Sequence, residues 1–431
     1  MEEKLKREIG VWGLTANIVN IMIGAGIFVL PAIVAAGLGS ASIIAYLFCG
    51  LLIGLVMLCF AEVGTKITSS GGPYAYIEYA FGEYFGFLTS ILFLLSSICA
   101  DAAVANAIVD ILGSLLPLLQ HQVARVLFFL ILFGGLAYIN VVGVKESLFL
   151  IKTITIAKLT PLMFLIVFGL PEITTQNIVW THFPSMNAIG EMCLVLFFAF
   201  IGAESGLSVG GEIKNSQRTI PRAIFISTIG VLIIYVLIQF ISQGTLGDSL
   251  PTFRENPLGE VARIIFGPVG LTLITVGAAV SMFGNLSSEL LSLPRVLYGA
   301  ANSNVIPFKI LASVHKKYAT PFVAIIVYAS IGLMFSLAGG FQQLAVIASA
   351  TLLLIYFGVS LAVIKLRRDS ATQVKSATFK IPGGYTVPIA AAVAILWFLS
   401  HLKMNELTAI AVFIAALSIL HVLKRRLTVV K

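Results

Sequence analysis

The chain reads Ile23-Gly24-Ala25-Gly26-Ile27-Phe28 in the middle of its first long apolar stretch and Ile201-Gly202-Ala203-Glu204-Ser205-Gly206 in the middle of a later one. Glycine weakens a helix interior, so each place is expected to interrupt a helix. Within a membrane, unwound backbone is tolerated only where it is buried in protein or lines a cavity. The two stretches therefore predict a cavity at membrane depth. The alternative is that their small residues only let neighbouring helices pack closely.

The composition is that of an integral membrane protein. Apolar residues make up 59% of the chain, charged residues only 11%, and the mean hydropathy is +1.03. A helix needs about 20 apolar residues to cross a bilayer. The apolar runs predict an all-α membrane protein with twelve transmembrane helices. Their expected spans are 12–37, 41–66, 84–115, 124–142, 148–170, 186–211, 222–243, 261–290, 320–338, 342–366, 386–402 and 406–424.

The positions of lysine and arginine predict the orientation. With the N-terminus in the cytoplasm, 22 of the 27 Lys and Arg residues fall in cytoplasmic segments, and four fall on the opposite side. This asymmetry follows the positive-inside rule. An even number of spans brings both termini to the cytoplasm, so we expect a multi-pass protein of the plasma membrane, or of the cell inner membrane of a bacterium. The net charge of +8 then reflects topology and not nucleic-acid binding.

Broken helices at corresponding places in the two halves of a chain are also the best sequence sign of a transporter's binding site. The chain has no GxxxxGK[ST] loop, so uphill transport would need an ion gradient or exchange. Its four cysteines are dispersed in apolar segments and its five histidines do not cluster, so we expect no metal and no cofactor. No histidine lies at the centre of a span, which disfavours an enzyme.

Further motifs resemble the amino acid–polyamine–organocation (APC) superfamily. They are Gly24-Ala25-Gly26-Ile27-Phe28 with Leu30-Pro31, Ser70-Gly71-Gly72-Pro73-Tyr74-Ala75-Tyr76 with Phe81-Gly82, Asn140 with Gly143-Val144-Lys145-Glu146-Ser147, Phe200-Ile201-Gly202-Ala203-Glu204, and Glu212-Ile213-Lys214-Asn215 with Arg218-Thr219-Ile220-Pro221. The motifs run in order along almost the whole chain, although Ser216 stands where the family usually has proline.

The resemblance implies a LeuT-like fold of two inverted five-helix repeats, in which helices 1 and 6 are broken. Residues 1–431 would form a single transmembrane transporter domain. Its first repeat would cover 10–170 and its second 186–366, and two peripheral helices would follow at 386–425.

The two breaks suggest how an amino acid would bind. The first frees N–H groups at the start of a half-helix, where the helix dipole is positive and favours a carboxylate. The second frees carbonyl oxygens at a half-helix end, which suit an α-ammonium group. Glycine would keep side chains from holding the ligand off the backbone. In related carriers the breaks hold the amino acid's backbone, which implies this role for Ile23, Gly24, Ala25, Gly26, Ile201 and Gly202.

Phe198 lies about one helical turn before the second break. The family places a bulky aromatic residue there, over the bound substrate, so the resemblance implies that Phe198 gates the site. Because the chain has 30 phenylalanines, packing or lipid contact is the alternative, and we expect it for Phe197.

Lys158 lies near the middle of the fifth span, too deep for its side chain to reach an interface. Ionisable residues at this depth are usually functional. The resemblance implies that the ammonium group replaces the sodium ion of sodium-coupled relatives and contacts the carbonyl groups of the first break. Desolvation there would make proton binding and release feasible. The alternative is a fixed cation, which would suit an exchanger.

Three carboxylates complete the candidate site. Glu204, at the second break, would either sense protons or fasten the unwound segment through hydrogen bonds to its amides. Asp101 lies within the third span, where a polar side chain of related arginine and polyamine carriers lines the distal pocket. Glu289 would approach the same pocket if the eighth helix continues toward Ala301, and two carboxylates there would favour a cationic or polar side chain. Alternatively, Asp101 pairs with Lys158, or Glu289 caps its helix at the membrane edge. Glu62, near a cytoplasmic helix end, is expected to anchor a loop.

These features predict a secondary active amino acid transporter that works by alternating access, independently of sodium, as a proton symporter or an amino acid exchanger. Its expected partners are a small-molecule amino acid, protons and the lipid bilayer, with no nucleic acid, and it would be a monomer or a homodimer. The alternatives are a polyamine or amino-acid/amine antiporter on the same fold and a nutrient sensor that does not transport.

Overall fold

The computed structural model describes residues 9–67, 72–143, 148–180, 183–204, 213–302, 305–306, 308–368 and 379–429. In this part of the chain the regular elements are helices, and a single isolated β-bridge joins Ile9 to Ile213. The motif residues at 70–71, 144–147, 205–206 and 212 lie outside the described residues.

The helices follow the apolar runs. They are α1 (Val11–Met22), α2 (Gly26–Leu38), α3 (Ile43–Lys66), α4 (Gly72–Phe81), α5 (Glu83–Gly113), α6 (Gln122–Val142), α7 (Leu148–Gly169), α8 (Met186–Leu196), α9 (Ser216–Leu246), α10 (Pro257–Asn302), α11 (Phe322–Ala338), α12 (Phe341–Arg368), α13 (Thr386–Leu399) and α14 (Met404–Val429). Each predicted span overlaps one of these helices or a broken pair of them. Over the described residues, seven helical stretches are long and apolar enough to cross a membrane.

The sequence did not predict α4, which lies in an expected loop. Its ten residues are too few to cross a bilayer. Pro73 stands in its first turn, where the missing N–H group does no harm. Gly82, with φ of +93°, ends it in a conformation that favours glycine and starts α5 directly afterwards.

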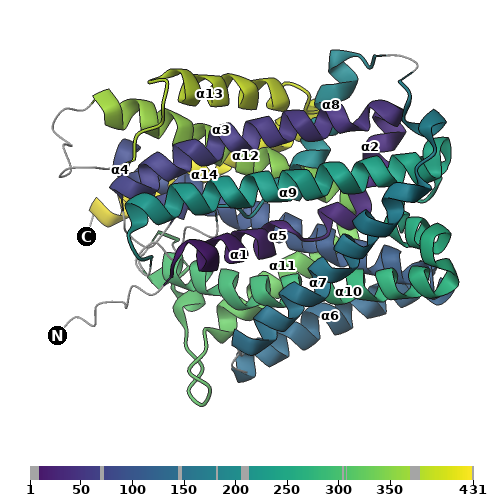
Figure 1. Cartoon of the computed structure of the whole chain (residues 1–431). Helices are drawn as coiled ribbons and strands as arrows, with labels where there is room; N and C mark the ends of the chain where they lie inside the picture. Colours follow the sequence, from purple (N-terminus) through teal and green to yellow (C-terminus); the bar gives the residue numbers. More distant parts are fainter. Residues whose placement is uncertain are drawn as a thin grey trace.

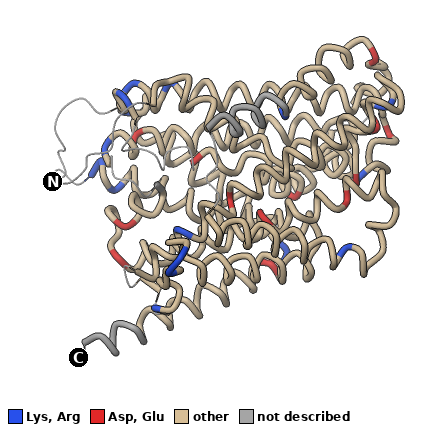
Figure 2. Tube along the Cα trace, turned by 90° about the horizontal axis from the view of Figure 1, so that it is seen from below, with Lys and Arg blue, Asp and Glu red and all other residues tan. Residues whose placement is uncertain are grey.

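Figure 1 shows the long helices lying roughly parallel in one bundle, with the start of α1 and the end of α14 at the same end of it. The blue Lys and Arg segments in Figure 2 also lie mostly toward that end. Helices α5 and α12 pack on each other in the interior. Each long helix has a most apolar stretch of 18 residues. The buried share of that stretch is 67% in α5 and 67% in α12, but only 11% in α14. Exposed side chains on outer helices include Leu51, Ile131 and Val412, as expected for a surface that faces lipid.

Both predicted helix breaks are present. α1 has 12 residues and α2 has 13, so neither could cross a bilayer alone, and Ile23 to Ala25 separate them. The second break follows α8, which continues as the 3-10 turn η5 (Phe197–Phe200) and then unwinds at residues 201–204. Gly202 has φ of +102° there, which a helix cannot accommodate. The expected continuation over 205–211 lies outside the part of the chain that the structure describes.

Glu62 joins three segments at the end of the bundle where α3 finishes. Its fully buried carboxylate accepts hydrogen bonds from Lys66 Nζ at 3.1 Å, from the Arg367 guanidinium at the end of α12, and from the Ile381 N–H at 2.9 Å. Ile381 belongs to the segment that leads into α13. The prediction that Glu62 anchors a loop is therefore confirmed.

Candidate substrate-binding site

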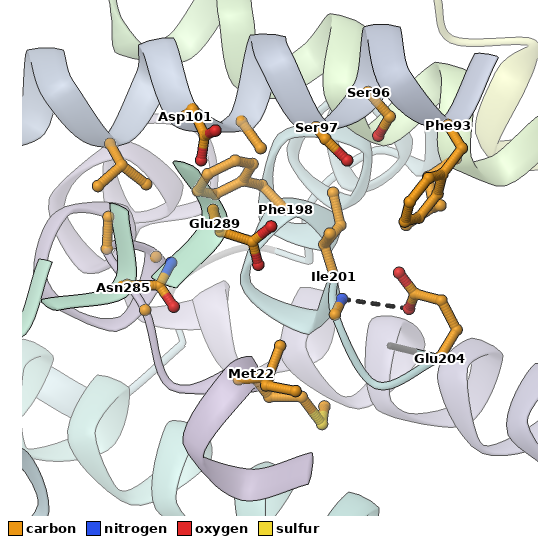
Figure 3. A pocket seen from close by; sticks show the side chains of 18 residues that line it. Met22, Phe93, Ser96, Ser97, Asp101, Phe198, Ile201, Glu204, Asn285 and Glu289 are labelled. Carbon is orange, nitrogen blue, oxygen red and sulfur yellow. Dashed lines mark hydrogen bonds between the residues drawn. The ribbon is translucent and has the colours of Figure 1, made fainter. Parts of the chain in front are cut away.

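A cavity of about 70 Å³ lies between the two helix breaks. Its walls come from the α1–α2 break, α5, η5 with the 201–204 turn, α10 and α12. Figure 3 shows side chains from these elements converging on it. Nine of the eleven predicted site residues line the cavity, namely Gly24, Ala25, Gly26, Asp101, Phe198, Ile201, Gly202, Glu204 and Glu289. The other two, Ile23 and Lys158, contact each other beside it.

The start of α2 opens onto the cavity. The chain leaves α1 with a hydrogen bond from the Gly24 N–H to the Met22 carbonyl at 2.9 Å, and α2 begins when the Phe28 N–H bonds to the Ala25 carbonyl at 3.0 Å. The first N–H groups of a helix have no partner inside it. Because Ala25 and Gly26 line the cavity, this positive helix end can hold an anion there.

The structure gives glycine at the breaks a further reason, besides the approach of the ligand expected from the sequence. A Cβ atom at Gly26 would lie 2.8 Å from Cα of Ala199, so the start of α2 packs directly against the backbone of η5. At Gly202 a Cβ atom would lie 2.5 Å from a methyl group of Ile21, in addition to the positive φ. Both glycines thus allow the two broken segments to approach each other. At Gly24 the nearest atom would be the Asn285 amide nitrogen at 3.6 Å, an ordinary contact.

Lys158 reaches from α7 to the end of α1. Its ammonium group donates to the carbonyl oxygens of Asn20 at 2.5 Å and Ile23 at 3.0 Å, and the residue is only 3% exposed. The expected contact with the first break is therefore present. None of the ion pairs among the described residues includes Lys158, so the alternative of a pair with Asp101 is wrong.

Glu204 holds its own turn together. One carboxylate oxygen accepts the Gly202 N–H at 3.2 Å and the hydroxyl of Tyr356 from α12. Of the two roles considered from the sequence, this geometry corresponds to the fastening one.

Asp101 and Glu289 reach the cavity from α5 and α10. The hydroxyl of Tyr328, on α11, donates to an Asp101 carboxylate oxygen at 2.7 Å. Helix α10 continues to Asn302, so Glu289 lies within the helix and does not cap it, and that alternative is also wrong. Figure 3 shows Asp101 and Asn285 toward one side of the view, Glu204 toward the other, and Glu289 between them.

Phe198 lines the cavity and meets the ring of Phe341 edge-on, with centroids 5.4 Å apart. Phe341 is the first residue of α12. Its neighbours in the chain Gly340 and Gln343 line a second cavity, of about 270 Å³, between α5, α6 and α11. Phe197 does not line the cavity. It is fully buried against Tyr356 and Phe398, as its expected packing role requires.

Sequence reasoning missed the tyrosines that tie the site together. The hydroxyl of Tyr235, on α9, lies 2.8 Å from the carbonyl oxygens of both Met22 and Ala199 and shares its hydrogen between them, so it connects the two breaks. Tyr328 and Tyr356 bind the carboxylates described above. Each of these three tyrosines stands in an apolar run, and a buried hydroxyl needs a partner, which is the signal that could have identified them.

Comparison with known proteins assigns the family. Residues 9–421 match the family model for amino acid permeases. The chain is 30% identical over 436 residues to the serine/threonine exchanger of Bacillus subtilis (strain 168), with 98% of each chain covered. It is 29% identical over 323 residues to the arginine/ornithine antiporter of Pseudomonas aeruginosa, covering 71% of this chain and 66% of the other. It is 26% identical over 416 residues to a branched-chain amino acid permease of B. subtilis, covering 92% and 88%.

These relatives are amino acid transporters, and the match extends over nearly the whole chain, as the resemblance of its motifs predicted. The chain therefore belongs to the amino acid permease family of the APC superfamily.

Proposed function

We propose that this permease is a sodium-independent secondary transporter of amino acids that works by alternating access. The observation that carries the proposal is the cavity between the start of α2 and the 201–204 turn. A zwitterion needs one site for a carboxylate and another for an ammonium group close by. The two broken helices provide backbone groups of both kinds in one place.

The substrate's α-carboxylate binds the N–H groups that begin α2, at Ala25 and Gly26. Its α-ammonium group binds the carbonyl oxygens of the 201–204 turn, beside the carboxylate of Glu204. Phe198 and Phe341 close the passage between this cavity and the larger one at the far ends of α5 and α11.

Lys158 takes the place of the sodium ion of sodium-coupled relatives, as a positive charge built into the protein at the end of α1. A charge that stays on the protein through the cycle favours exchange. The similarity to a serine/threonine exchanger supports the same choice. In the alternative, a proton symporter, Lys158 or Glu204 gains and loses a proton in each cycle.

The proposed topology is the LeuT-like repeat with both termini in the cytoplasm. The start of α1 and the end of α14 lie at the same end of the bundle, which supports an even number of crossings (Figure 1). The 22 Lys and Arg residues assigned to the cytoplasmic side support the orientation. An amine antiporter is the second candidate, because three carboxylates line the cavity.

The test is uptake of labelled amino acids by purified protein in liposomes. We expect uptake only when the liposomes contain unlabelled amino acid, with no effect of sodium. Uptake into empty liposomes driven by a pH gradient would establish a proton symporter in its place. A substrate profile limited to amines without a carboxylate would favour the second candidate, and no uptake of any compound would contradict the proposed function.

A further inference from the structure

The substrate cavity has an unusual balance of charge. Asp101, Glu204 and Glu289 line it, and no lysine, arginine or histidine is among its described lining residues. The buried cation nearby, Lys158, is turned to the carbonyl oxygens of α1. Carboxylates at membrane depth are unfavourable unless a cation or hydrogen-bond donors compensate them.

Two of the three carboxylates have donors. Asp101 accepts one hydrogen bond from Tyr328, and Glu204 accepts two, from Tyr356 and the Gly202 N–H. Glu289 forms no hydrogen bond or ion pair with the described residues, although it faces the cavity and lies close enough to Glu204 to feel its charge. Its carboxylate is therefore available to a donor that enters the cavity.

The arrangement in Figure 3 gives the cavity two anionic sides, Asp101 on one and Glu204 on the other, with Glu289 between them. The start of α2, which attracts a carboxylate, contributes to the same cavity. A simple zwitterion would bring one ammonium group and could compensate only one of these sides.

The size of the cavity limits the ligand. The cavity measures only about 70 Å³. This volume favours an amino acid with one or two side-chain methylene groups over one with a side chain as long as that of arginine.

We propose that the cavity selects a short diamino acid, whose second ammonium group binds Glu289 and Asp101 while its α-ammonium group binds beside Glu204. This inference rests on the proposed function and adds the substrate class. It makes Glu289 the residue that determines preference for a cationic side chain over a neutral one of the same size.

The test compares 2,4-diaminobutyrate with homoserine, which has a hydroxyl group in place of the side-chain ammonium group. Both compete for exchange in liposomes that contain the full-length protein. We expect 2,4-diaminobutyrate to compete at a concentration at least tenfold lower than homoserine. In Glu289→Gln this ratio should fall below threefold, through a loss of affinity for the diamino acid.

The matched control is Glu260→Gln, a carboxylate paired with Arg263 in the part of α10 that precedes the kink at Gly267. Glu260 does not line the cavity, so this variant should keep the wild-type ratio. Size-exclusion chromatography shows whether each variant is folded. If Glu289→Gln cannot be purified as folded protein, the preference of the wild-type protein for 2,4-diaminobutyrate over homoserine decides whether the inference holds.

Homoserine exchange without preference for the diamino acid would overturn the inference and leave the proposed function standing. Uptake of homoserine together with a proton would also overturn it, because protons would then compensate the carboxylates. Exchange of no amino acid would contradict the proposed function itself.

Discussion

The ammonium group of Lys158 occupies the C-terminal end of α1, where the last turn leaves carbonyl oxygens without partners inside the helix. The helix dipole is negative there and favours a cation. A buried charge without partners is strongly unfavourable, so the two carbonyl bonds, to Asn20 and Ile23, explain why a lysine is stable at this depth. The residue both caps α1 and places a positive charge beside the cavity.

Replacing Lys158 with methionine tests that role, since it keeps an unbranched side chain only one atom shorter and removes the charge. Hydrogen bonds to charged groups contribute about 1.5–3 kcal/mol each, so both stability and transport should fall, the exchange rate at least tenfold. The measurements are thermal unfolding and exchange in liposomes, with Lys403→Met at an exposed position as control. Wild-type exchange by Lys158→Met would show that the lysine only packs.

Tyr235→Phe removes only the hydroxyl that connects Met22 to Ala199. One hydrogen bond contributes about 1 kcal/mol, which corresponds to roughly a fivefold change in affinity if the bond holds the two breaks in the binding geometry. We expect substrate affinity to weaken by about this factor in an equilibrium binding assay. The control is Tyr138→Phe on α6, where the ring is 70% exposed. Equal affinity for Tyr235→Phe and the wild type would mean that the breaks hold their positions without this bond.

At the scale of elements, the two breaks pack against each other through backbone. Gly26 packs against Ala199 and Gly202 packs against Ile21, so the residues beside each break restrict the conformation of the other break. The sequence predicted where the breaks occur, because glycine in an apolar run is a local signal. It could not predict why glycine is needed, because the neighbours in question are more than 170 residues away along the chain. The tyrosine partners of Asp101 and Glu204 were missed for the same reason, because they lie 227 and 152 residues away along the chain.

Gly202→Ala should destabilise the protein for two separable reasons. Alanine is strained at the φ of +102° that this residue adopts, and its Cβ atom would clash with the side chain of Ile21. Backbone strain of this kind costs about 1–3 kcal/mol. We expect a lower unfolding temperature, which Ile21→Ala in the same chain restores only in part, because it removes the contact but not the strain. Gly134→Ala within α6, where a Cβ meets nothing within 4 Å, should be neutral or stabilising. Full recovery in the double variant would show that the backbone conformation at Gly202 is not strained.

At the scale of the whole molecule, the sequence was most informative about what the bilayer dictates. Crossing a membrane requires a certain length of apolar helix, so the positions of the helices could be predicted from the runs alone. α4 was not predicted because its ten residues are too few to cross a membrane. The number of crossings, the inverted repeat and the orientation depend on where the membrane lies, and they stay predictions.

The orientation makes a prediction that the chain's own cysteines allow to be tested. Cys49, Cys59, Cys99 and Cys193 are all buried, so the unmodified protein should react little with a membrane-impermeant maleimide. The exposed residues Thr252 and Lys316 lie between α9 and α10 and between α10 and α11, on opposite ends of α10. With both termini in the cytoplasm, Thr252→Cys should be labelled in intact cells, whereas Lys316→Cys should be labelled only after the membrane is opened. The reverse pattern would place the termini outside, and labelling of both in intact cells would mean that α10 does not cross the membrane.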